Sequence, residues 1–217
     1  LTLNRDEIAR LVAGQQGGRG QHDAAAVPVD LKDEGDRVRV LDLLARSDGL
    51  IEGFRPGVME RLGLGPDVCM SRNPALVFAR VTGWGQTGPL ASSVGHDINY
   101  LALSGALSTF GEADRPARPP LNLVGDYAGG ALMGAIGLLS GILQARTTGT
   151  GAVVDIAMTD GVALMTALFH ALKARGLWTD QRDANLLDGS TPFYRCYRCR
   201  DGGEVAVGAL EPRFYAA

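Results

Sequence analysis

The chain alternates between short apolar runs and longer segments in which apolar and polar positions recur with a helical period. The apolar runs at 49–52, 76–81 and 152–157 are bounded by glycine or polar residues, a pattern typical of buried strands. Helical periodicity extends over 34–46, before the first run, and over 160–175, after the last. This order predicts an α/β fold, in which helices connect buried parallel strands.

The segments around this framework give weaker patterns. Residues 27–32 favour one more short strand, which Pro28 confines to a strand start or a sheet edge. A polar, glycine-rich stretch at 14–21 follows no convincing strand, so its glycines do not favour a phosphate-binding loop. The turn at 53–57 ends the first strand, and 58–62 begins a short helix.

An uncharged apolar run extends from Ala128 to Ala145, and its length lies at the lower limit of about 18 residues for a membrane span. Its glycines have the spacing that lets helices approach closely in lipid or in a crowded soluble core: Gly130, Gly134, Gly137 and Gly141. Because the run stands between Asp126 and Arg146 in a sequence of α/β character, we interpret it as a buried core helix. No membrane span is expected.

The C-terminal part follows a different pattern. Residues 178–192 are polar and non-periodic, which predicts a linker. Two alternating segments, 193–199 and 204–210, flank Asp201-Gly-Gly203 and predict a β-hairpin. The chain is therefore divided into a large domain (1–156), a helix and linker (157–190) and the start of a smaller α+β domain (191–217).

Composition and charge argue against several classes of protein. The formal net charge of −3, with basic residues scattered along the chain, gives no support for a nucleic-acid partner. Only three cysteines occur and no export signal opens the chain, so a cytoplasmic protein is expected rather than a secreted disulfide framework. Cys196 and Cys199 have a zinc-like spacing, but no second ligand pair accompanies them and no metal site is expected.

Two segments place an ionisable side chain beside glycine at the edge of an apolar run. They are Gly95–Tyr100, which contains His96, and Leu121–Gly130, which contains Asp126. A histidine and a carboxylate that reach a substrate from two sides form an acid/base pair. The residues alone leave simpler interpretations open, since His96 also suits a turn and Asp126 also suits a helix cap.

Three other ionisable residues deserve separate interpretation. Arg55 and Arg61 follow a predicted strand end, where open α/β sheets bind ligands. They are candidates for contact with an anionic ligand and, equally, for solvated surface charges. His170 falls inside the predicted helix 160–175 with no visible partner, and we interpret it as an ordinary helix residue.

Five segments, taken in order, carry a specific resemblance to a known family. They are LIEGFRPG (50–57), RLGLG (61–65), RVTGWGQTGP (80–89), GHDINY (95–100) and NLVGDY (122–127). This set resembles the class III CoA-transferase (CaiB/BaiF) family, and within it the α-methylacyl-CoA racemases, from about Val27 to the C-terminus.

The resemblance implies an α/β fold with a Rossmann-like large domain, a linker and a smaller domain. The expected assembly is an interlocked homodimer with shared active sites. Compared with the family pattern, we expect the first strand and helix to be missing and the small domain to stop after its first hairpin.

The resemblance also implies an activity, namely inversion of the 2-position of 2-methyl-branched acyl-CoA thioesters by proton transfer through an enolate. His96 and Asp126 would be the two proton-transfer groups. The backbone N–H of Asp97 would bind the enolate oxygen, and Glu211 from the partner subunit would orient His96. Contacts to CoA are implied for Val29, Asp30, Leu31, Lys32, Arg55, Arg61, Gly95, Asn99 and Tyr100. No cofactor is implied, because CoA is part of the substrate.

Two other hypotheses stay open. A CoA-transferase of the same family would use Asp126 as a nucleophile and pass through a covalent intermediate. Transferases that resemble this chain generally lack a histidine at the position of His96, so this residue discriminates between the two activities. The third hypothesis is an inactive CoA-binding or dimerisation fragment, which the departures from the family pattern favour.

Overall fold

The structure is a computed structural model and describes residues 28–216. At its centre lies a parallel three-stranded sheet in the order β1-β2-β3, formed by Gly49–Glu52, Val77–Thr82 and Val153–Ala157. Gly49 pairs with Val77, and Phe78 pairs with Val153. Each strand agrees with its predicted run to within one residue at either end, so the predicted α/β fold is confirmed.

The strand predicted for 27–32 is wrong over 28–32, the part of it that the structure describes. There the chain forms irregular coil and a turn. The Asp36 carboxylate accepts a hydrogen bond from the Asp30 N–H at 2.8 Å, and the Asp30 carboxylate accepts one from the Lys32 N–H at 2.9 Å. These local side-chain acceptors take the place that a neighbouring strand would have filled.

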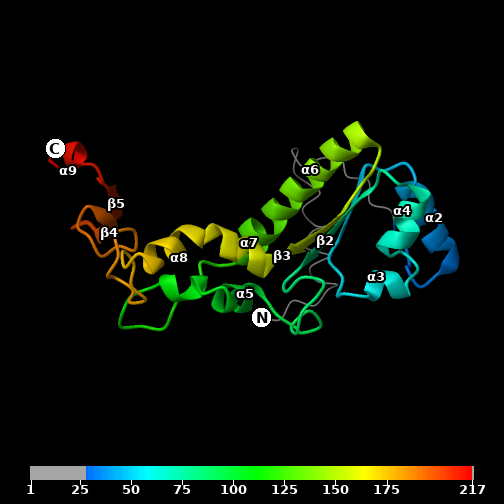
Figure 1. Cartoon of the computed structure of the whole chain (residues 1–217). Coiled ribbons are helices and arrows are strands. Elements are labelled where there is room, and N and C mark those ends of the chain that lie inside the picture. The colour runs from blue at the N-terminus through cyan, green and yellow to red at the C-terminus, as the bar shows by residue number, and fades with distance from the viewer. Residues whose placement is uncertain (1–27, 217) are drawn as a thin grey trace.

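Helices cover both faces of the sheet and give three layers (Figure 1). The face that carries Phe78 packs against α2 (Glu34–Leu44), α3 (Val58–Arg61) and α4 (Pro66–Arg72). Buried side chains from these elements form one cluster: Leu41, Leu44, Met59, Leu64, Cys69, Leu76 and Phe78. Val77 points to the other face, because side chains alternate along a strand, and contacts α6 (Met133–Thr148) there.

Glycines allow α6 to lie close to the sheet. A Cβ atom at Gly141 would come within 2.7 Å of the Val77 side chain, and one at Gly137 would come within 2.7 Å of Val154. On the opposite face of the same helical segment, large apolar side chains are more than half exposed: Leu132, Ile136, Leu139 and Leu143. The prediction of a buried core helix is therefore right for the glycine face and wrong for the leucine face.

The segment Leu123–Thr148 is also the one described helix that is long and apolar enough to cross a membrane by length and composition. Its glycine face rests on the parallel sheet, which is the position of a layer helix in an α/β domain.

The first part of that segment, η2 (Leu123–Leu132), is π-helical, which the sequence did not predict. It contacts α7 (Met158–Met165) through backbone, since a Cβ atom at Gly161 would collide with the carbonyl of Gly129. α5 (Asp97–Leu103) and η1 (Ala106–Thr109) lie beside α7. Leu101, Ala106 and Val162 form a second buried cluster between them.

The predicted helix 160–175 is present as two helices, α7 and α8 (Ala167–Ala174), which meet at Thr166. The Thr166 hydroxyl donates to the Val162 carbonyl at 3.0 Å. A hydroxyl that bonds back to the preceding turn bends a helix, which explains why the single predicted helix is divided here.

The predicted hairpin is present at the C-terminal end. β4 (Tyr194–Arg198) and β5 (Glu204–Gly208) are antiparallel, and α9 (Pro212–Tyr215) follows. Between α8 and β4 the chain forms turns without helix or strand, as predicted for 178–192. Figure 1 shows the hairpin and α9 at one end of the molecule and the parallel sheet at the other. The division of the chain into domains stays a prediction.

Candidate active site

Loops gather at one edge of the sheet, because parallel strands all end on the same side. The turn 53–57 follows β1, the glycine-rich loop 83–89 follows β2, and α7 follows β3 directly. The backbone N–H and the hydroxyl of Thr159 both donate to the Gly83 carbonyl, at 3.2 and 3.1 Å, and so fix this loop to α7. Open α/β sheets bind their ligands at this edge.

Tyr100 anchors α5 to the glycine-rich loop. A Cβ atom at Gly83 would overlap the Tyr100 ring, and one at Gly95 would come within 2.7 Å of it. The Trp84 ring meets Tyr100 edge to face, with ring centroids 4.8 Å apart. Only glycine at these two positions lets the ring lie flat against the backbone, so the packing sets the position of the residues that begin α5.

His96 stands immediately before α5, at the N-cap position, with its side chain exposed. Its backbone N–H donates to Oδ1 of Asn99 at 3.0 Å, and its carbonyl accepts from the Asn99 N–H at 2.8 Å. The backbone of His96 is thus fixed from both sides while the imidazole remains open to solvent. This arrangement suits a group that exchanges protons with a bound molecule.

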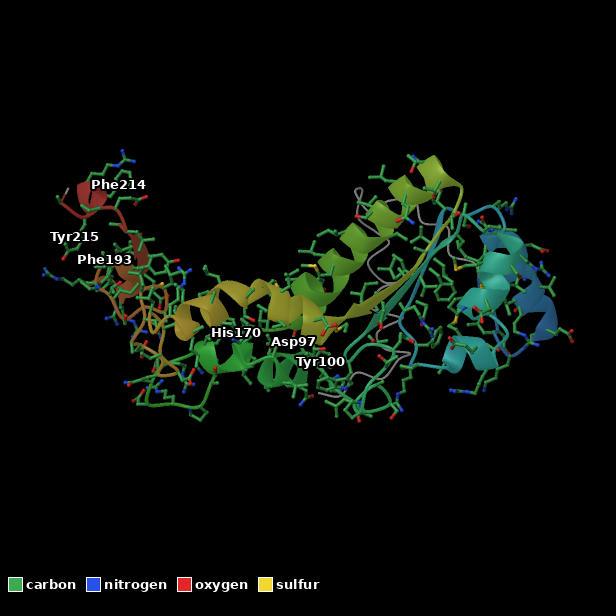
Figure 2. All side chains as sticks on the ribbon, in the orientation of Figure 1. Asp97, Tyr100, His170, Phe193, Phe214 and Tyr215 are labelled. Atoms are coloured by element: carbon green, nitrogen blue, oxygen red, sulfur yellow. The ribbon has the colours of Figure 1, made fainter. Side chains whose placement is uncertain are left out.

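The two segments that the sequence analysis singled out are in direct contact. Oδ1 of Asp97 accepts a hydrogen bond from the backbone N–H of Asp126 at 2.8 Å. A Cβ atom at Gly125 would collide with the Asp97 carboxylate, so glycine is required for this approach. Figure 2 shows Asp97 and Tyr100 on the same helix, close to α7. The structure therefore places the residues next to His96 against the residues around Asp126.

Asp126 occupies a half-buried position inside η2. Burial raises the pKa of its carboxyl group, and the negative charge of Asp97 raises it further. A hydrogen bond from Nδ2 of Asn122, 3.3 Å from Oδ2, and the charge of His96 act in the opposite direction. Asn122, not Asp126, holds the N-cap position of η2, so the alternative of Asp126 as a helix cap is wrong.

Arg55 and Arg61 form an exposed cationic pair at the end of β1. Neither is part of an ion pair among the described residues. Gly57 lies between them with a φ of 78°, and Nη1 of Arg61 lies 3.1 Å from the place where its Cβ atom would stand. The side chain of Arg61 therefore folds back over the turn that carries Arg55. Two free guanidinium groups at one turn suit an anionic ligand.

The segment 29–32 packs on the same side of the sheet as this pair. Leu31, Phe54 and Leu62 are all partly buried against the apolar cluster that contains Phe78. Val29, Asp30 and Lys32 are exposed there. Three of the segments predicted to contact CoA thus pack against one apolar cluster, on the side of the sheet opposite α6.

Glu211 is not brought to His96 within this chain. It is exposed and stands at the N-cap position of α9. Figure 1 shows α9 and α5 well separated along the molecule. The expected role of Glu211 toward His96 stays a prediction.

His170 has a partner that the sequence did not reveal. Its Nε2 lies 3.4 Å from the Thr166 hydroxyl, and the ring borders a cavity of about 140 Å³ between α8, η1 and the loop 178–188. Arg182 closes this loop by donating to the carbonyls of Ser108, Glu112 and Arg115. The cations around the cavity already have partners, so the site assigned to chemistry stays at His96 and Asp126.

The sequence analysis missed the side chain of Asp97, which it considered only for its backbone N–H. Asp97 is 8% exposed, and its Oδ2 has no hydrogen-bond partner among the described residues. Its position beside His96 was the only available signal. A buried carboxylate whose partner lies 29 residues away has no local pattern that would reveal it.

Comparison with known proteins gives consistent matches. Residues 15–217 match the family described as CoA-transferase family III. The chain is 42% identical over 212 residues to the human protein named alpha-methylacyl-CoA racemase, covering 98% of this chain and 53% of the human one. It is 39% identical over 148 residues to an acetyl-CoA:oxalate CoA-transferase from Acetobacter aceti, covering 68% of this chain and 37% of that protein.

A solved structure shares the fold. A crystal structure of a CAIB/BAIF family protein from Brucella suis superposes with a TM-score of 0.70 at 26% sequence identity, covering 80% of this chain and 46% of that one. The chain thus spans about half the length of the relatives it matches.

Proposed function

Because this chain belongs to CoA-transferase family III, we propose that it is part of an enzyme that inverts the 2-position of 2-methyl-branched acyl-CoA thioesters. The proposal rests on one observation above all: the residues beside His96 and Asp126 are in contact through the Asp97 carboxylate. The reaction moves one proton and needs no cofactor beyond the CoA that the substrate carries.

His96 and Asp126 serve as the two proton-transfer groups. Inversion is simplest when one group removes the α-proton from one face and a second group returns a proton to the other. An imidazole can both accept and donate a proton, so the exposed His96 acts as base toward one epimer and as acid toward the other. The raised pKa of Asp126 supports the matching role, because it keeps the carboxyl group protonated over a wider range.

The backbone N–H of Asp97 binds the oxygen of the enolate in this proposal. Asp97 is the first residue of α5. The first N–H groups of a helix have no acceptor within the helix, so this donor is available to an oxygen that becomes negatively charged.

The CoA moiety lies along the cationic turn in this proposal. Arg55 and Arg61 bind its phosphates, and the neighbouring residues 29–32 contact the nucleotide part. Gly95, Asn99 and Tyr100 contact the part of the substrate next to the thioester, since they surround His96 at the start of α5.

The active enzyme is a homodimer with shared sites. Glu211, too distant from His96 in its own chain, orients the imidazole of the partner subunit. The exposed leucine face of α6 supports this assembly, because apolar faces of this kind are typical of protein interfaces.

The decisive experiment is exchange of the α-hydrogen in heavy water with a 2-methylacyl-CoA and the full-length protein. We expect incorporation of deuterium by the wild type and a loss of at least about 100-fold in the variants His96→Ala and Asp126→Ala. His170→Ala serves as the matched control and should retain exchange. Undiminished exchange in both site variants would contradict the assignment.

A second candidate activity, CoA transfer between carboxylic acids, is favoured by the similarity to the Acetobacter aceti transferase. There Asp126 would attack the thioester and carry the acyl group and then CoA as covalent intermediates. Incubation with acyl-CoA followed by hydroxylamine or borohydride distinguishes the two, because only the transferase would yield a modified Asp126 by mass spectrometry.

A further inference from the structure

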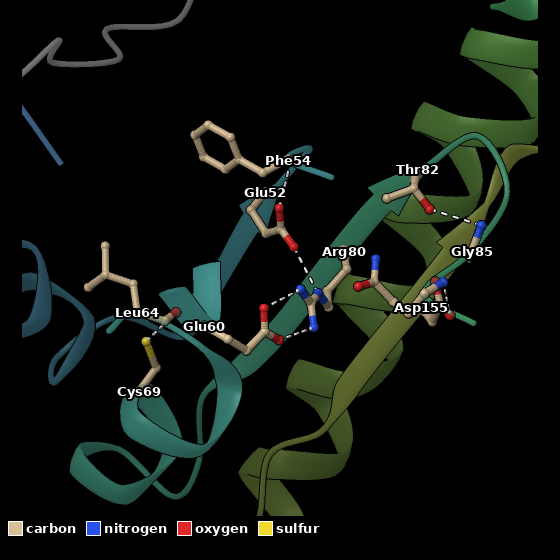
Figure 3. Close-up of polar contacts among 10 residues, drawn as sticks. Glu52, Phe54, Glu60, Leu64, Cys69, Arg80, Thr82, Gly85 and Asp155 are labelled. Carbon is tan, nitrogen blue, oxygen red and sulfur yellow. Dashed lines mark hydrogen bonds and ion pairs between the residues drawn. The ribbon is translucent and has the colours of Figure 1, made fainter. Parts of the chain in front are cut away.

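Arg80 lies in the centre of the sheet and is almost completely buried. Its side chain is 7% exposed, and that of Glu52, its neighbour in register on β1, is 2% exposed. Nε of Arg80 donates to Oε1 of Glu52 at 2.8 Å (Figure 3). A buried ion pair contributes little net stability, because desolvation of both charges offsets their attraction.

The two carboxylates bound by Arg80 belong to different elements, Glu52 to the end of β1 and Glu60 to α3. Oε2 of Glu52 accepts a hydrogen bond from the Phe54 N–H at 2.7 Å, inside the turn after β1. On the other side, Nη1 and Nη2 of Arg80 donate to Oε1 and Oε2 of Glu60 at 2.7 and 3.2 Å. Glu60 belongs to α3, so one guanidinium group connects β2 to both the turn and the helix (Figure 3).

The turn and the helix are the segments that carry the cationic pair. Arg55 lies one residue after Phe54, and Arg61 lies one residue after Glu60. Hydrogen bonds from Arg80 hold the pKa of Glu60 below its usual range, so this carboxylate stays ionised and bound. The charge of Arg61 also lowers the pKa of Glu60, so Arg80 and Arg61 both favour the ionised carboxylate.

We propose that Arg80 is a positioning residue which, through Glu52 and Glu60, holds Arg55 and Arg61 in the arrangement that binds the phosphates of CoA. The proposal rests on the function proposed above and adds to it the element that orients the phosphate site. Arg80 itself contacts no substrate; its effect is carried by the turn 53–57 and by α3.

The test compares two substrates in the full-length protein, a 2-methylacyl-CoA and the matching 2-methylacyl-pantetheine, which lacks the nucleotide phosphates. In Arg80→Lys, a single ammonium group replaces the fork that binds two carboxylates. We expect KM for the CoA thioester to rise roughly tenfold with kcat within about twofold of wild type, and KM for the pantetheine thioester to stay unchanged.

Glu60→Ala provides a second variant, because its carboxylate is 45% exposed and its removal leaves the pair of Arg80 and Glu52 in place. In Glu60→Ala, KM for the CoA thioester should rise by a smaller factor than in Arg80→Lys, and KM for the pantetheine thioester should stay unchanged. Arg72→Ala, which removes the exposed ion pair with Asp42 in the same layer, is the matched control and should change neither KM. Thermal melting of each variant shows whether it folds. If Arg80→Lys does not fold, the KM values of Glu60→Ala provide the test.

An equal rise in KM for both thioesters, or no change in KM for either, would overturn the positioning role while leaving the proposed racemase intact. A wild-type protein that exchanges the α-hydrogen of neither substrate would overturn both.

Discussion

The Asp97 carboxylate is the residue that joins the two halves of the site. It is buried, it accepts the backbone N–H of Asp126, and its charge adds to the effect of burial on the pKa of Asp126. A carboxyl group that holds its proton more tightly is a weaker acid but a stronger base, and more of it carries a proton to donate at a given pH. The contact that positions Asp126 therefore also adjusts its chemistry.

The raised pKa of Asp126 predicts a pH-dependent effect on stability. The folded state binds this proton more tightly than the unfolded state, so the contribution to stability is full at low pH and is lost as the pH rises through the raised pKa. Asp126→Asn, which cannot ionise, should be more stable than wild type above the raised pKa. The advantage should disappear toward about pH 4, the ordinary range of aspartate.

Thermal unfolding measured from acidic to neutral pH checks this prediction. Asp160→Asn, an exposed aspartate on α7, is the control. A difference between Asp126→Asn and wild type that is the same at every pH would show that burial of the charge is not its cause.

For single residues, the sequence predicts the identity of the site residues better than the contacts that position them. His96 and Asp126 stand out because each ionisable side chain lies beside glycine at an apolar boundary. The bond from Asp126 to Asp97 and the bonds from Arg80 to Glu52 and Glu60 join residues 20 to 29 positions apart. Such contacts depend on the folded sheet and leave no periodic signal in the chain.

Among the elements, α6 depends most on glycine. Its close approach to the sheet leaves room for a methyl group at one glycine and not at another. A Cβ atom at Gly134 would lie 3.5 Å from the Val81 side chain, an ordinary contact, whereas one at Gly141 would lie 2.7 Å from Val77. The two positions therefore form a matched pair within one helix.

We expect Gly134→Ala to stabilise the protein by up to about 1 kcal/mol, because alanine favours the helix over glycine. Gly141→Ala gains the same propensity but should lose about 1–3 kcal/mol by overpacking against β2. Urea unfolding of both variants measures the difference. If the two variants are equally stable, α6 does not pack on the sheet as described.

The elements that the sequence did not predict involve contacts within the folded chain. α7 and α8 divide where the Thr166 hydroxyl bonds back to the Val162 carbonyl, and η2 includes Gly129, which packs against the backbone of α7. The strand predicted for 27–32, which is wrong over 28–32, was assigned from its apolar residues, while Asp30 and Asp36 supply local acceptors that make a turn. The central strand β2 was predicted well because burial on both of its faces produces a continuous apolar run. β1 and β3 are less buried than predicted, since Ile51 and Val153 are exposed.

At the scale of the whole molecule, the distance between α9 and α5 leads to a test of shared sites. Two full-length inactive variants, His96→Ala and Glu211→Ala, are mixed and allowed to exchange subunits. Each mixed dimer then has one site with both an intact His96 and an intact Glu211. We expect recovery of about one quarter of wild-type exchange for random pairing, since half of the dimers are mixed and each has one complete site.

Each variant incubated alone provides the control, and light scattering reports the oligomeric state. If Glu211 acted on His96 of its own chain, mixing would restore nothing above the sum of the separate activities.

The pairing of β2 with β3 determines at which stage of folding the candidate site can form. The chain between Thr82 and Val153 contains α5, η2 and α6, so both His96 and Asp126 lie within a single crossover. Closing so long a loop is entropically costly, and long-range pairings form slowly. η2 packs on α7, and α7 reaches its position only after β3 has joined the sheet. A nascent chain therefore acquires its chemistry at the moment the sheet closes, and not when its individual helices form.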